Sequence, residues 1–166
     1  MSAPFCVERL APHHQRSAFV SGVEPLDRYL HSHAGQDARR RVSACFVATE
    51  RTTGKIGGYY TLAMSSVLLS DVPEAIARRL PHYPTIPTAR LGRLAVDQDF
   101  RGRGLGGALL WDAFQRAAAA EIAAFALLVD AKDDSAAAFY RHHGFLSLSG
   151  SERTLFLPLS EPQAMR

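Results

Sequence analysis

The sequence of 166 residues is poor in lysine, which occurs only at Lys55 and Lys132. Its other basic side chains are therefore arginines or histidines, although the formal net charge is only +3. Arginine forks bind phosphate groups through paired hydrogen bonds, which suits a nucleotide or nucleic-acid partner. A GC-rich genome that favours arginine codons explains the same composition, and composition alone favours that explanation.

Cysteine is also scarce, and long hydrophobic runs are absent. Cys6 and Cys45 lie far apart without CxxC spacing, so we expect two small buried apolar residues rather than a disulfide or a metal site. The N-terminal segment has no apolar core of the kind that signal peptides carry. No segment reaches the roughly 18 apolar residues of a membrane helix. These absences predict a soluble, cytoplasmic protein with no bound metal.

One stretch, residues 90–107, organises the chain. An apolar run at residues 91–96 predicts a strand, the sequence RGRGLGG follows a polar turn, and the next residues favour a helix. Glycines let the backbone approach an anion, and the N-terminal end of a helix holds it through free N–H groups and its dipole. A glycine run alone is weak evidence, because many such runs are only mobile turns. The flanking strand and helix and the two loop arginines favour a phosphate cradle.

The remaining pattern predicts one domain over residues 1–166, long enough to bury a sizeable core. Alternating and continuous apolar runs predict strands, and helical spacing predicts helices. The expected strands are 5–10, 43–49, 56–69, 89–96, 125–130, 145–148 and 154–158, and the expected helices are 24–41, 72–80, 108–120 and 135–142. Residues 13–19 are expected to begin a further helix or a loop that ends at residues 21–22. This order implies an α/β or α+β sheet with helices on both faces.

Glycine and proline positions refine these elements. Gly35 is expected to weaken or divide the helix at residues 24–41. Gly57 and Gly58 indicate a bulge or a close backbone approach. Pro81, Pro84 and Pro87 predict a stiff irregular connector before the fourth strand. Asp133 and Asp134 are candidate N-caps of the last helix, and Gly144 is expected to end it.

Three pieces of the sequence resemble the GNAT family of N-acetyltransferases. The family signature (Arg/Gln)-x-x-Gly-x-(Gly/Ala) matches Arg101, Gly104 and Gly106, and the sequence AFYRHHGF at residues 138–145 matches a second family block. The resemblance implies a single mixed, mostly antiparallel sheet in which strands four and five splay apart at a bulge. It also implies that acetyl-CoA enters between the sequences RLAVD and FALLVD.

The same resemblance assigns candidate cofactor contacts. Backbone N–H groups of the loop would bind the pyrophosphate, and main-chain groups at the end of the preceding strand would hold the pantetheine arm and acetyl carbonyl. Ser135 occupies a position where many family members have a CoA-contacting asparagine, so its contribution is open. The cofactor-binding candidates are Leu94, Ala95, Val96, Arg101, Gly102, Arg103, Gly104, Leu105, Gly106, Gly107, Ser135 and Phe139.

A narrower resemblance covers most of the chain and involves residues 23–50, 59–69 and 86–97. These segments are similar to the TacT- and AtaT-like GNAT toxins of bacterial toxin–antitoxin pairs, in which acetylation of the α-amine of charged tRNA blocks translation. Ser21 stands where that group usually has cysteine. The resemblance implies a ribbon-helix-helix antitoxin, contact with operator DNA only through the antitoxin complex, and a homodimer.

Tyr140 is the candidate catalytic residue. A phenol with an ordinary pKa near 10 is a proton donor at neutral pH, and family enzymes place a tyrosine here near the sulfur of CoA. A core tyrosine packed beside Phe139 is the alternative. We name no general base, because Asp97 and Asp99 are expected to be turn or cap residues. His142 and His143 are expected to cap the end of a helix.

Seven arginines are candidates for contacts with tRNA phosphates, which would make binding fall as salt rises. Each is individually more typical of a solvated surface charge, and those at a helix end are also favourable caps. The candidates are Arg39, Arg40, Arg41, Arg78, Arg79, Arg90 and Arg93, of which Arg93 is preferred.

Two other functions remain open at this point. The enzyme could acetylate a small-molecule amine or a protein N-terminus instead of charged tRNA. The fold could also serve as a non-catalytic module that binds acetyl-CoA for regulation. The intact glycine loop and Tyr140 argue against the second alternative.

Overall fold

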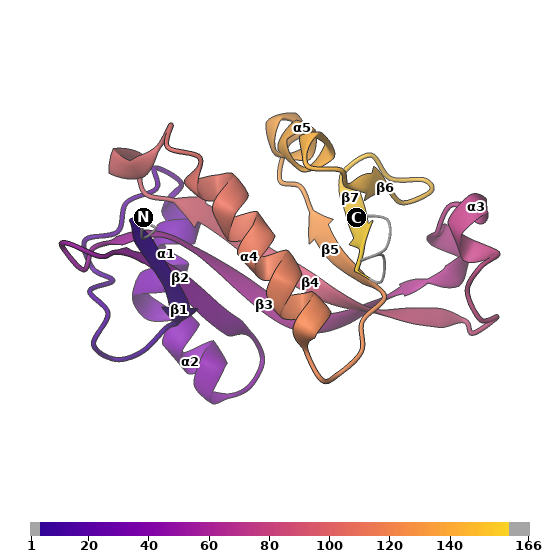
Figure 1. Cartoon of the computed structure of the whole chain (residues 1–166), viewed down its shortest axis with the longest axis horizontal. Helices are drawn as coiled ribbons and strands as arrows, with labels where there is room; N and C mark the ends of the chain where they lie inside the picture. Colours follow the sequence, from indigo (N-terminus) through magenta and orange to yellow (C-terminus); the bar gives the residue numbers. More distant parts are fainter. Residues whose placement is uncertain (1–3, 160–166) are drawn as a thin grey trace. The chain divides into compact units, whose positions relative to one another are not determined.

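The computed structural model describes residues 4–159 (Figure 1). Its elements are β1 (Phe5–Arg9), α1 (Glu24–Ser32), α2 (Ala34–Arg39), β2 (Ala44–Glu50), β3 (Ile56–Leu68), η1 (Leu69–Asp71), α3 (Glu74–Ala77), β4 (Thr85–Val96), η2 (Gln98–Phe100), α4 (Leu105–Ala119), β5 (Ala126–Asp130), α5 (Asp134–His142), β6 (Leu146–Ser147) and β7 (Thr154–Pro158). Two short 3-10 helices are additions to the predicted order of helices and strands. Residues 13–19, where a helix or a loop was expected, form a loop with turns.

The described strands form one seven-stranded sheet in the order β1-β2-β3-β4-β5-β7-β6. β1 pairs with β2, β2 with β3, β5 with β7 and β6 with β7 in antiparallel fashion. β4 and β5 pair in parallel from Thr88↔Ala126 to Leu91↔Val129, whereas β4 continues to Val96. The predicted mixed, mostly antiparallel α/β sheet is confirmed, and its parallel pairing stops before β4 ends.

The fourth strand begins at Thr85, which corrects the expected start at residue 89. Pro87 was expected to belong to an irregular connector, yet it lies inside the strand. Proline lacks the backbone N–H donor, but its carbonyl can still accept a hydrogen bond from a neighbouring residue. The Pro87 carbonyl accepts a hydrogen bond from the Phe125 N–H at 2.8 Å, and Thr88 then begins the pairing with β5.

The division of the first helical segment is also displaced from its expected position. α1 ends at Ser32 and α2 begins at Ala34, so the break lies at His33, whose φ is −120°. Gly35 lies within the first turn of α2 and does not form the break itself. The expected division is therefore confirmed, and its position is corrected by two residues along the printed sequence.

Both interpretations of Gly57 and Gly58 are confirmed. The pairing of β2 with β3 shifts between Ala48↔Gly58 and Thr49↔Ile56, which leaves Gly57 as the extra residue of a bulge. A Cβ on Gly58 would lie 2.7 Å from Leu109 Cδ1 and 2.9 Å from the Ala95 carbonyl oxygen. Only glycine lets α4 and β4 approach β3 this closely.

The chain divides into two compact units, which are described separately. The first unit comprises the described part of Met1–Ala63 together with Gly92–Ala113. Two successive tyrosines of β3 point to opposite faces here, as the pleat of a strand requires. The Tyr59 hydroxyl donates to the Leu26 carbonyl of α1 at 2.6 Å, and the Tyr60 hydroxyl donates to Asp112 of α4 at 2.5 Å. Helices therefore cover both faces of the sheet in this unit.

The second unit comprises Met64–Leu91 and the described part of Phe114–Arg166. Its core cluster joins Val72, Ala126, Leu128, Leu148 and Phe156, all of which are buried. The first four residues of β5 are buried, as the continuous apolar run predicted for a central strand.

The structure tests two expectations from composition, which concern the cysteines and membrane-spanning helices. Cys45 is buried and Cys6 is only half-buried, and both are free thiols. The prediction of two buried cysteines is therefore right for Cys45 alone. Among the described residues, no helix combines the length and the apolar character needed to span a bilayer.

Candidate active site

The loop that follows β4 is fixed at its entry by Asp97, a buried residue. Its carboxylate caps η2 by accepting from the Asp99 N–H at 2.8 Å, and it also accepts from the Val20 N–H at 2.9 Å. The Asp97 N–H donates to the Gly57 carbonyl at 2.8 Å. Asp97 therefore ties the loop to the bulge of β3 and to the segment before α1. The expected turn or cap role is confirmed.

The glycines of the loop are required by conformation. Gly102 and Gly104 have φ of 78° and 75°, and an added Cβ would meet nothing within 4 Å at either position. The Gly104 carbonyl accepts from the Ala108 N–H at 3.1 Å, the first hydrogen bond of α4. The N–H groups of Leu105, Gly106 and Gly107 therefore precede any intrahelical acceptor. Together with the helix dipole they can bind an anion.

The two loop arginines already contact protein groups. Arg101 donates to the Ser21 carbonyl, and Arg103 lies 3.8 Å from a carboxylate oxygen of Glu50 and 5.0 Å from the centroid of the Phe100 ring. Both side chains hold the loop against the rest of the first unit. Main-chain N–H groups are therefore the main hydrogen-bond donors that this segment can offer to an anion.

The expected pantetheine contacts lie at the end of β4, beyond its last pair with β5. Ala95 is buried, and Leu94 and Val96 are half-buried. The Ala95 carbonyl oxygen lies 2.9 Å from the position of a Cβ on Gly58, so this strand end is firmly placed within the first unit. A contact of these main-chain groups with a cofactor stays a prediction.

Tyr140 lies on α5 in the second unit. Asp133 caps this helix by accepting from the Ala136 N–H at 2.8 Å, which confirms one of the two expected caps. The phenol ring packs against Phe139 and Phe145 at centroid distances of 5.3 and 5.4 Å. Burial raises the pKa of Tyr140 to about 12, so the group is a neutral phenol at physiological pH.

The hydroxyl of Tyr140 donates to no residue within the described range 4–159. Within that range, no protein acceptor competes with another molecule for its proton. The core packing that competed with a catalytic role is present, but it constrains the ring and leaves the hydroxyl available. Packing and proton donation are compatible at this position.

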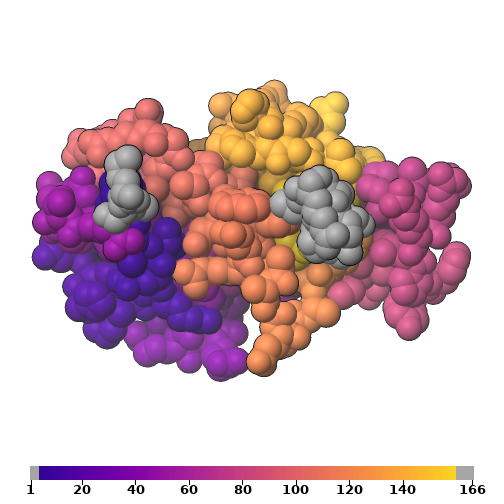
Figure 2. All heavy atoms as spheres, in the orientation of Figure 1, coloured from indigo at the N-terminus to yellow at the C-terminus, as the bar shows by residue number. Residues whose placement is uncertain are grey.

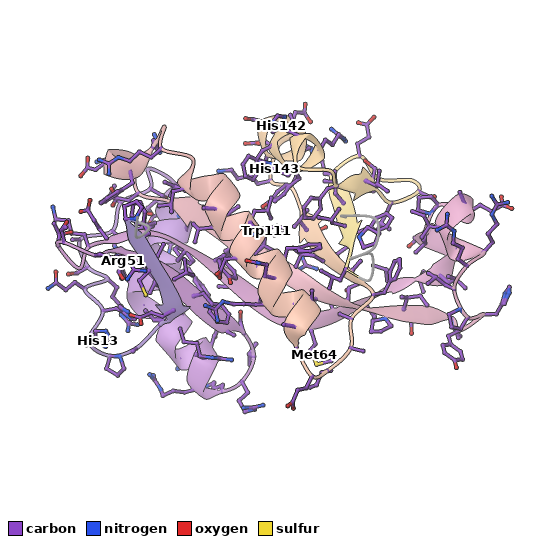
Figure 3. All side chains as sticks on the ribbon, in the orientation of Figure 1. His13, Arg51, Met64, Trp111, His142 and His143 are labelled. Atoms are coloured by element: carbon purple, nitrogen blue, oxygen red, sulfur yellow. The ribbon has the colours of Figure 1, made fainter. Side chains whose placement is uncertain are left out.

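The histidines at the end of α5 do not form a base for Tyr140. His142 and His143 are both exposed and lie at the end of the helix (Figure 3). His143 Nδ1 is 2.9 Å from the Phe139 carbonyl oxygen, an arrangement that satisfies a carbonyl of the last turn. The predicted cap is confirmed for His143. Ser135 is exposed in the first turn of α5 and Phe139 is half-buried, and their cofactor contacts stay predictions.

The candidate arginines fall into two groups. In the second unit, Arg90 forms an ion pair with Asp130, which also accepts from the Thr154 hydroxyl at 2.9 Å. Arg78 and Arg79 are exposed just after α3. In the first unit, Arg39, Arg40 and Arg41 are exposed at the end of α2.

Arg93, also in the first unit, lies with its guanidinium 3.5 Å from the centroid of the Tyr29 ring. This is a cation–π contact at stacking distance. The Tyr29 hydroxyl in turn donates to Asp37 at 2.8 Å. Burial is the main cause that raises the pKa of Tyr29 to about 12, and the Arg93 charge opposes the rise.

One basic residue of this region is absent from the sequence-based candidates. Arg16 is half-buried in the segment before α1, and its Nη1 lies 3.2 Å from the position of a Cβ on Gly35. Arg39 Nη1 lies 3.4 Å from the same point. No motif or periodicity marks Arg16, because its proximity to α2 arises from the fold.

Comparison with known proteins identifies the family. Residues 9–145 match the Acetyltransferase (GNAT) family. The chain belongs to this family. It is 39% identical over 147 residues to a tRNA-acetylating toxin of Mycobacterium tuberculosis, with 87% of this chain and 86% of the relative covered. It is 30% identical over 164 residues to the probable toxin TacT of Sinorhizobium fredii, with 93% and 91% covered. The GNAT resemblance found in the motifs is confirmed.

Solved structures agree with this assignment. AtaT complexed with acetyl-methionyl-tRNAfMet has a TM-score of 0.90 and 28% identity, covering 97% of this chain and 98% of AtaT. A tyrosine-to-phenylalanine mutant of AtaT, bound to acetyl-CoA and the C-terminus of the antitoxin AtaR, has a TM-score of 0.80 and 25% identity, covering 98% of each chain. This GNAT chain is an acetyltransferase by family, and its fold is that of these neighbours.

Proposed function

We propose that this GNAT protein transfers an acetyl group from acetyl-CoA to the α-amine of aminoacyl-tRNA and thereby acts as a toxin that blocks translation. The observation that carries the proposal is the 39% identity to a tRNA-acetylating toxin, which extends over 87% of the chain. The similarity to AtaT complexed with acetyl-methionyl-tRNAfMet supports the same substrate class. Residues 1–166 form a single catalytic domain in this proposal.

Acetyl-CoA fits the loop that precedes α4. Exposed residues Arg101 to Gly104, two of them left-handed glycines, leave the backbone accessible, and the first turn of α4 adds free N–H groups. These groups bind the pyrophosphate, and main-chain groups of Leu94, Ala95 and Val96 bind the pantetheine arm. The bound thioester supplies the acetyl group. Ser135 and Phe139 are further cofactor contacts.

Tyr140 acts as the proton donor to the sulfur of CoA as the thioester bond breaks. As the acceptor nitrogen forms its bond to the acetyl carbon, the carbon–sulfur bond breaks and negative charge develops on sulfur. The phenol donates a hydrogen bond to that sulfur and gives it a proton, and it regains a proton released by the acceptor amine. A pKa of about 12 lies above that of an ordinary thiol, near 8.5, so the hydrogen bond to the developing charge is a large part of its contribution.

The acceptor amine needs little help from the protein. The α-amine of an aminoacyl ester has a lower pKa than an alkyl amine, so a useful fraction is neutral near pH 7. We assign no general base, because Asp97 is occupied by two backbone N–H groups and His143 caps α5. Water accepts the proton of the amine and returns one to the oxygen of Tyr140.

Arginines provide the tRNA contacts in this proposal, and the candidates are Arg39, Arg40, Arg41, Arg78, Arg79, Arg90 and Arg93. The protein acts in the cytoplasm as a homodimer.

A ribbon-helix-helix antitoxin neutralises it and carries it to operator DNA. Complexes of AtaT with the antitoxin AtaR, alone and on DNA, support an antitoxin partner and contact with DNA through the complex.

The test is induced expression of the wild-type protein and of Tyr140→Phe, with total charged tRNA analysed for N-acetylated aminoacyl groups. We expect growth arrest and N-acetyl-aminoacyl-tRNA with the wild type, and neither with the variant. The variant removes one hydroxyl and preserves the ring that packs against Phe139 and Phe145. Its expression level and melting temperature provide the control for folding.

Two outcomes would overturn parts of the proposal separately. Acetylation of a metabolite or a protein N-terminus without any tRNA product would remove the toxin function and leave an acetyltransferase of another substrate class. Equal arrest and equal tRNA acetylation by both proteins would remove Tyr140 as the proton donor and leave the substrate assignment intact.

A further inference from the structure

Residues 20–23 connect the loop that precedes α4 with the first turn of α1, and all of the groups involved belong to the first unit. Toward the loop, the Val20 carbonyl accepts a hydrogen bond from the Gln98 N–H at 2.8 Å. Toward the helix, the Val23 carbonyl accepts from the Asp27 N–H at 3.1 Å. This segment therefore places the start of α1 against the loop that is expected to bind the cofactor.

Ser21 is the buried centre of this connection, and each of its polar groups has a partner. Its N–H and its hydroxyl both donate to Asp27 Oδ1, at 2.8 and 2.6 Å. Its Oγ accepts from the Val23 N–H at 3.1 Å, and its carbonyl accepts from the Arg101 guanidinium. Ser21 is therefore bonded to a carboxylate on one side and to a guanidinium on the other.

The two charged groups fix Ser21 more firmly than neutral partners would. Hydrogen bonds to an ionised group are shorter and about twice as strong as those between neutral groups, and the 2.6 Å bond from the Ser21 hydroxyl to Asp27 has that length. Bonds that are joined in a network also strengthen one another. Asp27 therefore holds Ser21 in place, and Ser21 in turn holds Arg101.

Arg101 is held in this way without losing its charge. Its partner is a neutral carbonyl, and within residues 4–159 no ion pair joins it to a carboxylate. Arg103 of the same loop differs, because it lies 3.8 Å from a carboxylate oxygen of Glu50. Gly22 has a φ of 92°, and a Cβ on it would lie 3.0 Å from Arg101 Nη2, so glycine leaves room for the guanidinium. The loop thus contains a fixed positive charge that an anion can use.

A role limited to capping α1 does not explain the contacts of Asp27. Val23 is the N-cap of this helix, and no side chain caps it. The Asp27 carboxylate instead accepts from Ser21, which lies outside the helix. Glu24, the other acidic residue of the first turn, is exposed and forms an ion pair with Arg28 within the helix. Only one of the two acidic residues therefore connects α1 with the loop.

We propose that Asp27 is a positioning residue for acetyl-CoA binding and that it acts through Ser21 and Arg101. The inference rests on the proposed function for the cofactor loop, and it does not depend on which amine is the acceptor. Figure 2 shows atoms of this loop, coloured salmon, on the surface of the chain, and Arg101 is one of its exposed residues. Because the arginine is already immobilised, the pyrophosphate gains its charge with a smaller loss of side-chain entropy.

The experiment measures cofactor binding separately from the reaction. Dissociation constants of acetyl-CoA are determined by calorimetry without acceptor for the wild type, Asp27→Asn, Ser21→Ala, Arg101→Gln and the double variant Asp27→Asn/Arg101→Gln. The kcat with charged tRNA at saturating acetyl-CoA is measured in parallel. Glu24→Gln is the matched control, because it removes the other negative charge from the same turn of α1.

We expect Arg101→Gln to raise the dissociation constant of acetyl-CoA by about tenfold, and Asp27→Asn and Ser21→Ala to raise it by about three- to fivefold. The double variant should match Arg101→Gln alone, because Asp27 acts through that arginine. Ser21→Cys keeps a weak donor and should lie between the wild type and Ser21→Ala. Glu24→Gln should have the wild-type constant, and kcat should stay unchanged in Asp27→Asn and Ser21→Ala.

Four results would overturn the positioning role. The first is a wild-type constant in both Asp27→Asn and Ser21→Ala. The second is a double variant whose loss is the product of the two single losses, because the two residues would then act independently. The third is an equal loss in Glu24→Gln, which would show a general effect of charge. The fourth is a lowered kcat with an unchanged constant. If Asp27→Asn has a lowered melting temperature, Ser21→Ala and Ser21→Cys decide the result.

The proposed function fails on a different observation. A wild-type protein that shows these losses of acetyl-CoA binding but acetylates only a small amine would remove the tRNA reaction and keep the positioning role. A wild-type protein that acetylates charged tRNA, with Asp27→Asn and Ser21→Ala at the wild-type constant, would keep the reaction and remove the positioning role.

Discussion

The two units of the chain differ in the chemical groups that they present. One presents exposed main-chain N–H donors, and the other holds a buried phenol. The first unit exposes the loop Arg101 to Gly104 and presents main-chain N–H groups at the start of α4. The second unit buries the Tyr140 ring and raises the pKa of its phenol to about 12. The first unit therefore presents groups that can bind negative charge, and the second holds a phenol that keeps its proton at physiological pH.

This difference has a physical cause in each unit. An anion is bound by fixed dipoles that remain accessible to it, and left-handed glycines keep the loop backbone accessible. A proton is kept by excluding water from the charged form of the acid, which requires burial among apolar groups. Substitutions in the first unit should therefore change substrate binding, whereas loss of the Tyr140 hydroxyl should change the chemical step.

The largest effect is expected from Tyr140→Phe in steady-state kinetics. The change removes the proton donor and keeps the packed ring, so kcat should fall by about 10²–10⁴-fold, the range of general acid–base catalysis. The KM for acetyl-CoA should stay near its wild-type value. Initial rates of acetyl transfer to charged tRNA over a range of both substrates provide the measurement.

Tyr83→Phe is the matched control for this substitution. Tyr83 is 64% exposed and belongs to the same unit, so removal of its hydroxyl should leave kcat unchanged. A rise of KM for acetyl-CoA in Tyr140→Phe with unchanged kcat would contradict the comparison, because the phenol would then act in cofactor binding.

The second expected effect concerns stability at high pH. The pKa of Tyr140 is about 12 in the folded chain and near 10 when unfolded, so the folded state holds this proton more tightly. The resulting stabilisation is complete below pH 10 and is lost as pH rises from 10 to 12. A shift of this size corresponds to about 3 kcal/mol of unfolding free energy. Denaturant unfolding of the wild type and Tyr140→Phe across this range measures it.

Other buried groups lose stability at high pH as well. Burial raises the pKa of Tyr29, Tyr59 and Cys45, and all three remain in the variant. The difference between the two proteins therefore isolates Tyr140. Parallel losses of unfolding free energy in both proteins would show that Tyr140 is not protected from water.

A third prediction tests the loop with two glycines of equal backbone geometry. Gly104 and Gly54 both have φ of 75°, and a Cβ on either would meet nothing within 4 Å. Alanine at either position should cost roughly 1–2 kcal/mol of stability, because only the left-handed conformation is penalised. We expect about a tenfold rise in the KM for acetyl-CoA from Gly104→Ala alone, as the loop N–H groups shift.

Gly54 lies in the turn between β2 and β3, away from the loop that precedes α4. Gly54→Ala therefore measures the stability cost of the backbone strain alone. Equal values of KM for acetyl-CoA in both variants would show that the loop does not hold the cofactor. Chemical denaturation confirms that the two substitutions have similar costs.

Most of the fold was predictable because local patterns and the tertiary structure agree. The buried run of β5, the cap at Asp133 and the bulge at Gly57 each follow from a residue preference that the fold preserves. The start of β4 was not predictable in this way. Pro87 lacks a donor and is unusual in a strand, and only the pairing of its carbonyl with Phe125 places it there.

The residues of the candidate site also differ in whether the sequence alone predicts them. The glycine loop and Tyr140 carry motifs, so the sequence predicts them directly. Arg16 carries none, and its approach to Gly35 depends on how the segment before α1 folds back toward α2. Arg90 and Arg93 look alike in sequence, yet one is neutralised by Asp130 and the other stacks on Tyr29. Charge pairing is decided by tertiary neighbours.

The smallest expected effect comes from Asp97→Asn, which tests how the loop is anchored. The two carboxylate oxygens of Asp97 accept from Val20 and Asp99, and an amide keeps one acceptor only. The loss of one hydrogen bond should cost about 1 kcal/mol of stability. The KM for acetyl-CoA should rise by a smaller factor than in Gly104→Ala, because the loop glycines keep their conformation.

Asp99→Asn is the control, since the Asp99 side chain is exposed and only its backbone N–H enters the network. It should leave both the melting temperature and the KM for acetyl-CoA unchanged. If Asp97→Asn lowers kcat and leaves this KM alone, Asp97 acts in the chemical step, and binding and proton transfer are not divided between the two units. A change confined to stability and KM supports that division, because the anchor then serves only the anion-binding loop.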